Sequence, residues 1–304
     1  MANQEYLQRL FQGTDSWNQW RNKNSAAAVD LSYADLSQRQ LQAANLKNVN
    51  LTGANLIGTT LTQADLSEAN LAQADLSGAD LNQVNLAQAS LCQANLLGAD
   101  LSASNLRQAD LGQATFNRSN LSEADLSQTN LKEASLVGAD LSRASLQAAN
   151  LQAANLKRAD LQRSDLSQCS LTGADLSDAR LLNTNLENAN LSQAVLTGAR
   201  LNRATLVNAN LSGANLTGAT LLGANLTQAN LTGATLRESN FSGANLSYAN
   251  LSGQDLTHLN FTGASLKGAI LQNANLTQAI LTEADLAEAD LTGALLPTGV
   301  AAPE

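Results

Sequence analysis

Very few side chains in this 304-residue sequence are of the types that carry out catalysis or bind transition metals. His258 is the only histidine, and Cys92 and Cys169 are the only cysteines. A serine or cysteine nucleophile needs a histidine partner, and a transition-metal site needs several histidines and cysteines. We therefore interpret His258 as a surface structural residue. The sequence predicts a protein that is not an enzyme and has no catalytic residue, cofactor or metal.

Aspartates are more abundant, so calcium is the other metal to consider. The aspartates alternate irregularly with asparagines, and the glycine-rich nonapeptide pattern of calcium-binding β-rolls is absent. Both side chains favour turns because they bond to nearby backbone N–H groups. We interpret them as turn residues. The formal net charge of -9 also disfavours binding to nucleic acid phosphates.

The elements that position these residues follow from a five-residue repeat. From Leu31 to Leu296 every fifth residue is leucine, except Phe116, Phe241 and Phe261. The residue two before each of these is small, usually alanine, and the residue between is most often Asp or Asn. A period of five places the leucines all round an α-helix and on alternating faces of a flat strand, so neither fits.

Each repeat is better interpreted as one short extended side followed by one corner. Residues 74–78, with the sequence ADLSG, are a typical copy, and 16 of the 19 glycines lie two residues after the repeat leucine. That is the third place of a four-residue turn, where a type II turn needs a positive φ. Four sides close a coil of about 20 residues, and coils stack about 4.8 Å apart. The sequence predicts an all-β solenoid of about 13 coils with leucine and alanine inside.

This A-(D/N)-L-x-x unit, uninterrupted from about residue 29 to 293, resembles the pentapeptide repeat family. The resemblance implies a right-handed quadrilateral β-helix, with the other three positions of each repeat facing outward. The leader, with FQG at residues 11–13 and WNQWR at 17–21, is similar to leaders of bacterial and especially cyanobacterial members. The ending GALLPTG at 293–299 is also similar to theirs. A bacterial, cyanobacterial-type protein is expected.

The repeat divides the chain into an N-terminal helical cap at 1–28, the β-helix at 29–296 and a tail at 297–304. A stack of coils has unpaired edges and exposed leucines at its ends, which need covering. The leader predicts two short helices, and we interpret their apolar residues as a lid on the first coil. A partner-binding helix is the alternative. These residues are Leu7, Leu10, Phe11, Trp17 and Trp20.

The C-terminal end has less to cover it, because only residues 297–304 follow the last repeat leucine. Near this end Ile270, Ile280 and Leu295 also replace the outward Asn or Asp. Either the tail shields the last coil or this end forms a homodimer, as the resemblance to quinolone-resistance proteins implies. We expect a monomer in preference to the dimer.

The two cysteines are predicted to remain free thiols. Cys169 occupies an inward position and is expected to be buried and inert, whereas Cys92 points outward. About four coils separate them, which is beyond the reach of a disulfide.

Three inward alanine positions carry large residues, namely Arg39, Gln254 and Leu259. Arg39 is expected to turn toward the cap and an acid such as Asp35. Gln254 and Leu259 lie near two of the repeat phenylalanines, so we expect a local swelling of the coil there. A ligand pocket at that swelling is the alternative.

Charge on the outside varies along one face. Asp80 and Asp100, and later Asp140 and Asp160, precede arginines on this face and on its adjoining corner. The arginines form either a self-neutralising charge ladder or a partner-binding patch, with two outward leucines beside them. The candidate patch consists of Arg143, Arg163, Arg180, Arg200, Arg203, Leu182 and Leu222.

These features predict a non-enzymatic, rigid scaffold or regulator that binds one or more protein partners, with no direct binding to nucleic acid or membranes. We see no signal peptide and no apolar span, so a cytoplasmic location is expected. The family resemblance suggests a regulatory role, such as in differentiation of filamentous cyanobacteria.

The alternative that the resemblance implies is a DNA-mimicking binder of a type II topoisomerase, DNA gyrase. The acidic composition favours it, whereas the modest charge density, the arginines and the absence of looped insertions oppose it. An inert structural or engineered rod is the third possibility, but the irregular ends and outliers favour a natural chain.

Overall fold

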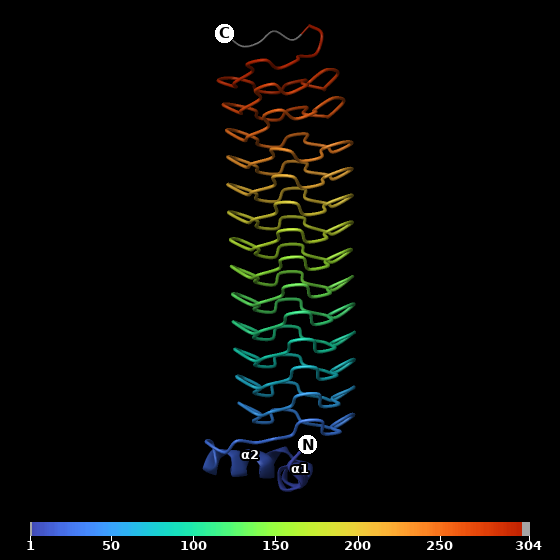
Figure 1. Cartoon of the computed structure of the whole chain (residues 1–304), viewed down its shortest axis with the longest axis vertical. Helices are drawn as coiled ribbons and strands as arrows, with labels where there is room; N and C mark the ends of the chain where they lie inside the picture. Colours follow the sequence, from blue (N-terminus) through green and yellow to red (C-terminus); the bar gives the residue numbers. More distant parts are fainter. Residues whose placement is uncertain (1, 300–304) are drawn as a thin grey trace. The chain divides into compact units, whose positions relative to one another are not determined.

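The computed structural model describes residues 2–299, which divide into a first unit that ends at Asn150 and a second unit that begins at Leu151 (Figure 1). Helix α1 spans Gln4–Phe11 and helix α2 spans Thr14–Lys23. The remaining described residues form coils in both units. Residues 300–304 of the predicted tail lie outside the described residues.

Each unit is a solenoid in which residues 20 apart pair in parallel. Asn50 pairs with Asn70 in the first unit, and Asn210 pairs with Asn230 in the second. Such bridges recur every five residues, so a coil has four sides and 20 residues, as the repeat predicts. The extended segments are isolated bridges, and no longer strand occurs between residues 2 and 299. The reason is that a corner follows each side after about three residues.

The interior of each solenoid is lined by the repeat leucines and alanines. In the first unit, Ala74 and Leu76 are 1% and 0% exposed, and the corresponding residues of the second unit are buried up to Ala279, whereas those from Leu281 onward are half-buried. Alanine lets opposite walls approach while leucine fills the middle. A buried leucine contributes about 1.5–3 kcal/mol, much of which is offset by ordering of the backbone.

The corners have a left-handed residue two positions after each repeat leucine. The expected positive φ is present at glycines such as Gly218, where φ is 68°. Most corners, however, have another residue there, such as Gln93 with a φ of 60°. This conformation costs a non-glycine residue about 1–2 kcal/mol. The N–H of Gln93 donates to the carbonyl of Gly112 in the next coil at 2.9 Å, a bond that helps to hold the corner.

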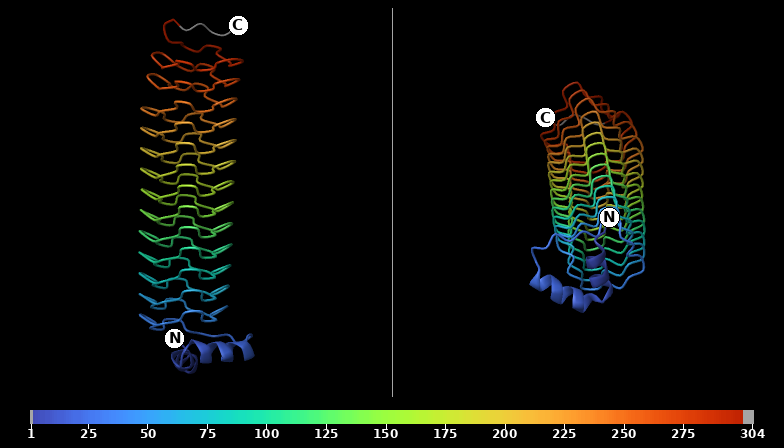
Figure 2. Two further views of the ribbon diagram at one scale, coloured as in Figure 1. Left: turned by 180° about the vertical axis from the view of Figure 1, so that it is seen from behind. Right: turned by 60° about the horizontal axis from the view of Figure 1, so that its bottom comes forward.

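Helix α2 lies next to the first coils of the first unit (Figure 2). It contacts them through polar and aromatic side chains. Trp17 is fully buried, and its Nε1 donates to the carbonyl of Asn45 at 2.8 Å. Asn18 donates to the carbonyl of Ala43 at 2.9 Å and accepts from the N–H of Asn45 at 2.8 Å. Arg21 donates to the carbonyl of Lys47. These bonds use backbone groups at the edge of the solenoid.

The apolar residues of the leader differ in burial. Leu10 is 1% exposed, Leu7 is half-buried, and Trp20 is half-buried with its ring 5.4 Å from that of Trp17. Phe11 is 42% exposed, and its ring lies 4.0 Å from the guanidinium of Arg39.

Arg39 therefore turns toward the helices as expected, but it does so as an exposed cation over an aromatic ring. The pKa of Asp35 is lowered mainly by hydrogen bonds from Ser37 and also by the charge of Arg39, so these two charges interact as expected, although no ion pair joins them in the described chain. A cation placed over an aromatic face is stabilised by the ring quadrupole.

Candidate protein-binding surface

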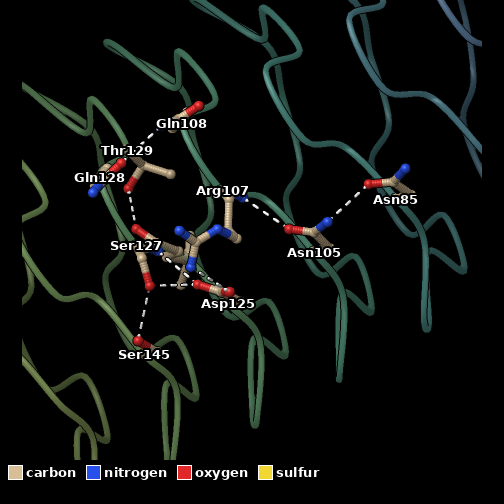
Figure 3. A network of polar contacts seen from close by, with 10 residues as sticks. Asn85, Asn105, Arg107, Gln108, Asp125, Ser127, Gln128, Thr129 and Ser145 are labelled. Carbon is tan, nitrogen blue, oxygen red and sulfur yellow. Dashed lines mark hydrogen bonds and ion pairs between the residues drawn. The ribbon is translucent and has the colours of Figure 1, made fainter.

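The outward Asp and Asn side chains form hydrogen-bonded ladders along the sides of each unit. The side-chain oxygen of Asn105 accepts from the backbone N–H of Arg107 at 3.1 Å, and its amide donates to Asn85 of the preceding coil at 3.0 Å (Figure 3). Asp125 accepts from Ser127 and pairs with Arg107 at 3.3 Å. These contacts agree with the interpretation of Asp and Asn as turn residues.

The same bonds lower the pKa of several aspartates. In Asp30 the main cause is the backbone N–H of Ser32, which donates to the carboxylate at 2.9 Å. The pKa of Asp125 is also lowered: partial burial acts to raise it, but hydrogen bonds from Ser127 and Arg107 outweigh that effect. These carboxylates are therefore charged and already bonded within the protein.

The face of the second unit that carries arginine begins at an ion pair. Arg180 lies 3.5 Å from the carboxylate of Asp160 in the preceding coil. Arg200 pairs with Arg180 through a backbone bridge and is exposed. Arg200 has no ion pair among the described residues. Two guanidinium groups on adjacent coils are thus balanced by one carboxylate.

The adjoining corner of the second unit adds two more exposed arginines. The N–H of Arg163 donates to the carbonyl of Leu182, and the N–H of Arg203 donates to the carbonyl of Leu222, so these four residues follow one corner. Neither arginine forms an ion pair with any residue that the structure describes. Leu222 is 40% exposed and Leu182 is half-buried. The charge ladder is therefore only partly neutralised.

Arg143 belongs to the first unit, where it pairs with Glu123 at 2.9 Å. Both side chains are more than half exposed, and such surface pairs contribute little to stability. The structure thus brings together six of the seven predicted patch residues in the second unit and describes Arg143 separately.

The few residues suited to chemistry are dispersed. Cys169 is buried and Cys92 is partly exposed, and no disulfide joins them, as predicted. Among residues 2–299 no three His, Cys, Asp or Glu side chains could together hold a metal ion. Neither helix in this part of the chain is long and apolar enough to cross a membrane.

One cavity lies where the sequence predicted a local swelling or, as the alternative, a ligand pocket. A hollow of about 450 Å³ in the second unit is lined by Arg237, Glu238, Asp255, Thr257 and His258. The sequence signal was the pair of large inward residues, Gln254 and Leu259, which lie in the same coil.

Two profiles of known protein families match this chain. The family profile described as pentapeptide repeats matches eight overlapping segments, at residues 30–68, 44–83, 154–193, 184–223, 194–233, 224–258, 234–273 and 260–296. A second profile, for a pentapeptide repeat region, matches residues 64–141.

The chain belongs to the pentapeptide repeat family.

Several solved structures resemble this pentapeptide repeat protein. HetL, involved in regulation of heterocyst differentiation in the cyanobacterium Nostoc, is 35% identical; the match covers 83% of this chain and 91% of HetL, with a TM-score of 0.25. A thylakoid-lumen pentapeptide repeat protein from Arabidopsis thaliana is 31% identical over 32% of this chain and 67% of its own, with a TM-score of 0.31.

A more distant match is QnrB1, a plasmid-mediated fluoroquinolone resistance protein. It is 22% identical over 62% of this chain and 89% of its own, with a TM-score of 0.38. No curated protein matches the chain.

Proposed function

We propose that this pentapeptide repeat protein is a non-enzymatic scaffold or regulator that binds an acidic protein partner through the second unit. The arginine surface, defined here as Arg163, Arg180, Arg200, Arg203, Leu182 and Leu222, is the binding region. The observation that carries the proposal is that three of its four guanidinium groups have no ion pair among the described residues, beside an exposed leucine.

The backbone gives this surface its specificity. Each arginine lies on a coil whose N–H and C=O groups bond to the neighbouring coils, so the spacing between the arginine α-carbons is fixed. A partner carboxylate can accept two parallel hydrogen bonds from one guanidinium. Clustered positive charges mainly raise the association rate and select partners, while contacts such as that of Leu222 with an apolar side chain slow dissociation.

The proposal also includes the handedness and number of the coils, the role of the N-terminal residues, and the oligomeric state and location of the protein. We infer a right-handed β-helix of about 13 coils from the length of the unbroken repeat. We also infer that residues 1–28 act as a cap, supported by the bonds from Trp17 and Asn18 to backbone groups of the first coils. We further propose a monomeric, cytoplasmic protein of a cyanobacterium. A role in regulating a cellular programme is suggested by the 35% identity to HetL, which is involved in regulation of heterocyst differentiation.

A DNA-mimicking binder of a type II topoisomerase, such as DNA gyrase, is the second candidate. The observation that favours it lies in the first unit, where Asp80 and Asp100 pair on adjacent coils and place two carboxylates in one ladder. This function would use an acidic face and would not need the arginine surface.

Affinity capture from the native cytosol tests both functions. The baits are the natural protein, a variant with Arg163, Arg180, Arg200 and Arg203 changed to Glu, and a matched control. The control changes Lys23, Lys47, Arg118 and Lys157 to Glu, which alters the net charge equally at exposed positions. Arg143→Glu is tested separately because Arg143 is in the first unit.

We expect a partner that binds the natural protein and the control and is reduced at least about tenfold on the arginine variant, a loss of about 1.4 kcal/mol. A partner that binds all baits equally would show that the arginine surface is not used. A topoisomerase on all baits, together with inhibition of supercoiling by the purified protein, would favour mimicry.

A further inference from the structure

One junction between two adjacent coils in the second unit lacks backbone hydrogen bonds that are present at the equivalent positions of the neighbouring junctions. Between residues 232 and 260 the N–H of Leu236 does not reach the carbonyl of Asp255, and the N–H of Asp255 does not reach the carbonyl of Ala234. The N–H of Glu238 likewise forms no hydrogen bond with the carbonyl of Thr257. Two further N–H groups without their expected partners, within the described second unit, are those of Gly233 and Asn260.

The junctions on either side show that this is a local opening. One coil earlier, the N–H of Leu216 donates to the carbonyl of Thr235 at 2.8 Å and the N–H of Gly218 donates to that of Arg237 at 2.9 Å. One coil later, the N–H of Leu256 donates to the carbonyl of Asn275 at 2.8 Å. That later junction keeps its other bonds, except that the N–H of His258 has no backbone partner in the described chain.

The opening is closed at both ends. The N–H of Leu231 donates to the carbonyl of Asn250 at 2.9 Å, and the N–H of Phe241 donates to that of Asn260 at 2.9 Å. Between these bonds the two coils separate, as seen at the right-hand edge of the orange coils in Figure 1. The hollow of about 450 Å³ described above lies here.

Its cause lies in two side chains that are too large for their positions. Gln254 and Leu259 occupy inward places that alanine fills in most coils, and they are 4% and 2% exposed. Phe261 follows in the same coil, with its ring stacked 5.3 Å from that of Phe241. This extra volume holds the coil away from its neighbour, because a close-packed interior does not absorb added methylene groups.

The opening presents backbone groups in a defined order. One rim offers the N–H groups of Gly233, Leu236 and Glu238, and the other offers the carbonyls of Ser252, Asp255 and Thr257. Gly233, Glu238 and Asp255 are exposed, so these backbone groups are open to a partner with alternating acceptors and donors. An extended peptide backbone has that arrangement, and it adds to unpaired sheet edges in this way.

We propose that this opening, the inter-coil slot, binds a short extended peptide segment of a partner protein. The peptide carbonyls accept from the N–H groups of the first rim and from that of Asp255, and the peptide N–H groups donate to the carbonyls of the second rim. The straight part of the slot, from Ala234 to Leu236, spans one side of the coil, so about three or four residues of the peptide pair with it.

Side chains at the corner define what else the peptide can carry. Arg237 and His258 lie beside Glu238 and Asp255, so the cavity has both signs of charge. Asp255 already accepts from the hydroxyl of Thr257 at 2.8 Å and from its N–H at 3.1 Å. A neutral segment with small side chains therefore fits better than one with a strong net charge. This site is separate from the arginine surface and does not depend on the proposed function.

Amide hydrogen exchange by NMR on the full chain tests the slot, with a Thr-Val-Thr-Val tetrapeptide, blocked at both ends, as the probe. Without peptide, we expect the amides of Leu236, Glu238 and Asp255 to exchange at least about 100-fold faster than those of Leu216, Gly218 and Thr235 one coil earlier. Millimolar peptide should slow the three slot amides at least about tenfold and leave the reference amides unchanged.

A double variant, Gln254→Ala with Leu259→Ala, serves as the negative control because it restores alanine at both inward positions. We expect its slot amides to be protected without peptide, and peptide to have no effect on them. Arg237→Gln should keep peptide protection, because the backbone provides the binding. Protected slot amides in the natural protein would overturn the proposal, as would exposed amides that no concentration of peptide protects, which would indicate a slot filled by water alone.

Discussion

The two units share one backbone repeat but differ in what they place on the outside. Corners of the first unit carry glutamines whose side chains bond from coil to coil, as Gln73 does to Gln93 and Gln93 to Gln113. Between residues 213 and 268 most corners of the second unit are glycine, for example Gly213 and Gly218, and the arginine surface and the inter-coil slot are also in the second unit. The outer surface therefore differs between the units while the same kind of interior maintains the fold.

The largest effect on stability is expected from substitutions in the interior, which both units build in the same way. Leu86 in the first unit and Leu206 in the second are both fully buried at the same place in the coil. Each change to Ala should lower the free energy of unfolding by about 2–5 kcal/mol, because a cavity remains. Leu222→Ala, at an exposed position, should cost less than about 0.5 kcal/mol. Urea unfolding measures all three, and a cost below about 1 kcal/mol in only one unit would show that the interiors are not equivalent.

Exchanging corner residues between the units should have a smaller effect. Gly218→Gln brings a first-unit residue to a φ of 68° and should cost about 1 kcal/mol, since left-handed backbone is strained in any residue with a side chain. Gln93→Gly removes that strain but also removes two side-chain bonds, so its net effect should be near zero. Urea midpoints of the two variants give the comparison. A Gly218→Gln variant as stable as the natural protein would mean that the bonds between coils fully offset the strain.

The smallest expected effect is the response of both units to acid. The pKa of Asp35 in the first unit is lowered chiefly by the Ser37 hydroxyl, and that of Asp255 in the second chiefly by the Thr257 hydroxyl. A carboxyl with a lowered pKa in the folded state stabilises the fold above its unfolded pKa of about 4, and this contribution disappears as the pH falls through the folded value. Thermal unfolding between pH 7 and pH 2 should show the loss.

Asparagine at these positions retains the oxygen that accepts from the turn but cannot titrate. Asp35→Asn and Asp255→Asn should therefore each weaken the dependence of the melting temperature on pH below about 4. Unchanged profiles would indicate that other carboxylates dominate acid unfolding.

The regular part of the fold could be predicted from the sequence because a single constraint repeats. Every inward position must be small or leucine, so the period of five determines side, corner and burial from residues such as Ala74 and Leu76. The exceptions were harder. Gln254 and Leu259 indicated a disturbance, but whether a coil swells or separates depends on how bonds across the whole junction respond to the added volume.

The arginine surface illustrates a different limit. Spacing placed Arg180 and Arg200 on one face, and the structure agrees. Which of the arginines finds a carboxylate depends on side-chain rotamers, and only the geometry distinguishes Arg180, paired with Asp160, from Arg200, which has no ion pair in the described chain. The left-handed glutamines were also unforeseen, because glycine marked the corner so clearly that its replacement was not considered.

The contacts of helix α2 with the first coils bear on how the protein forms during synthesis. Trp17 and Asn18 bond to residues fewer than 30 positions later, and each subsequent coil pairs with the one completed 20 residues before it. An emerging chain can therefore fold within each unit as it leaves the ribosome, one coil at a time, without waiting for distant sequence. A stalled or truncated product would carry a folded beginning and an open last edge, which makes accurate completion of synthesis a direct safeguard against aggregation.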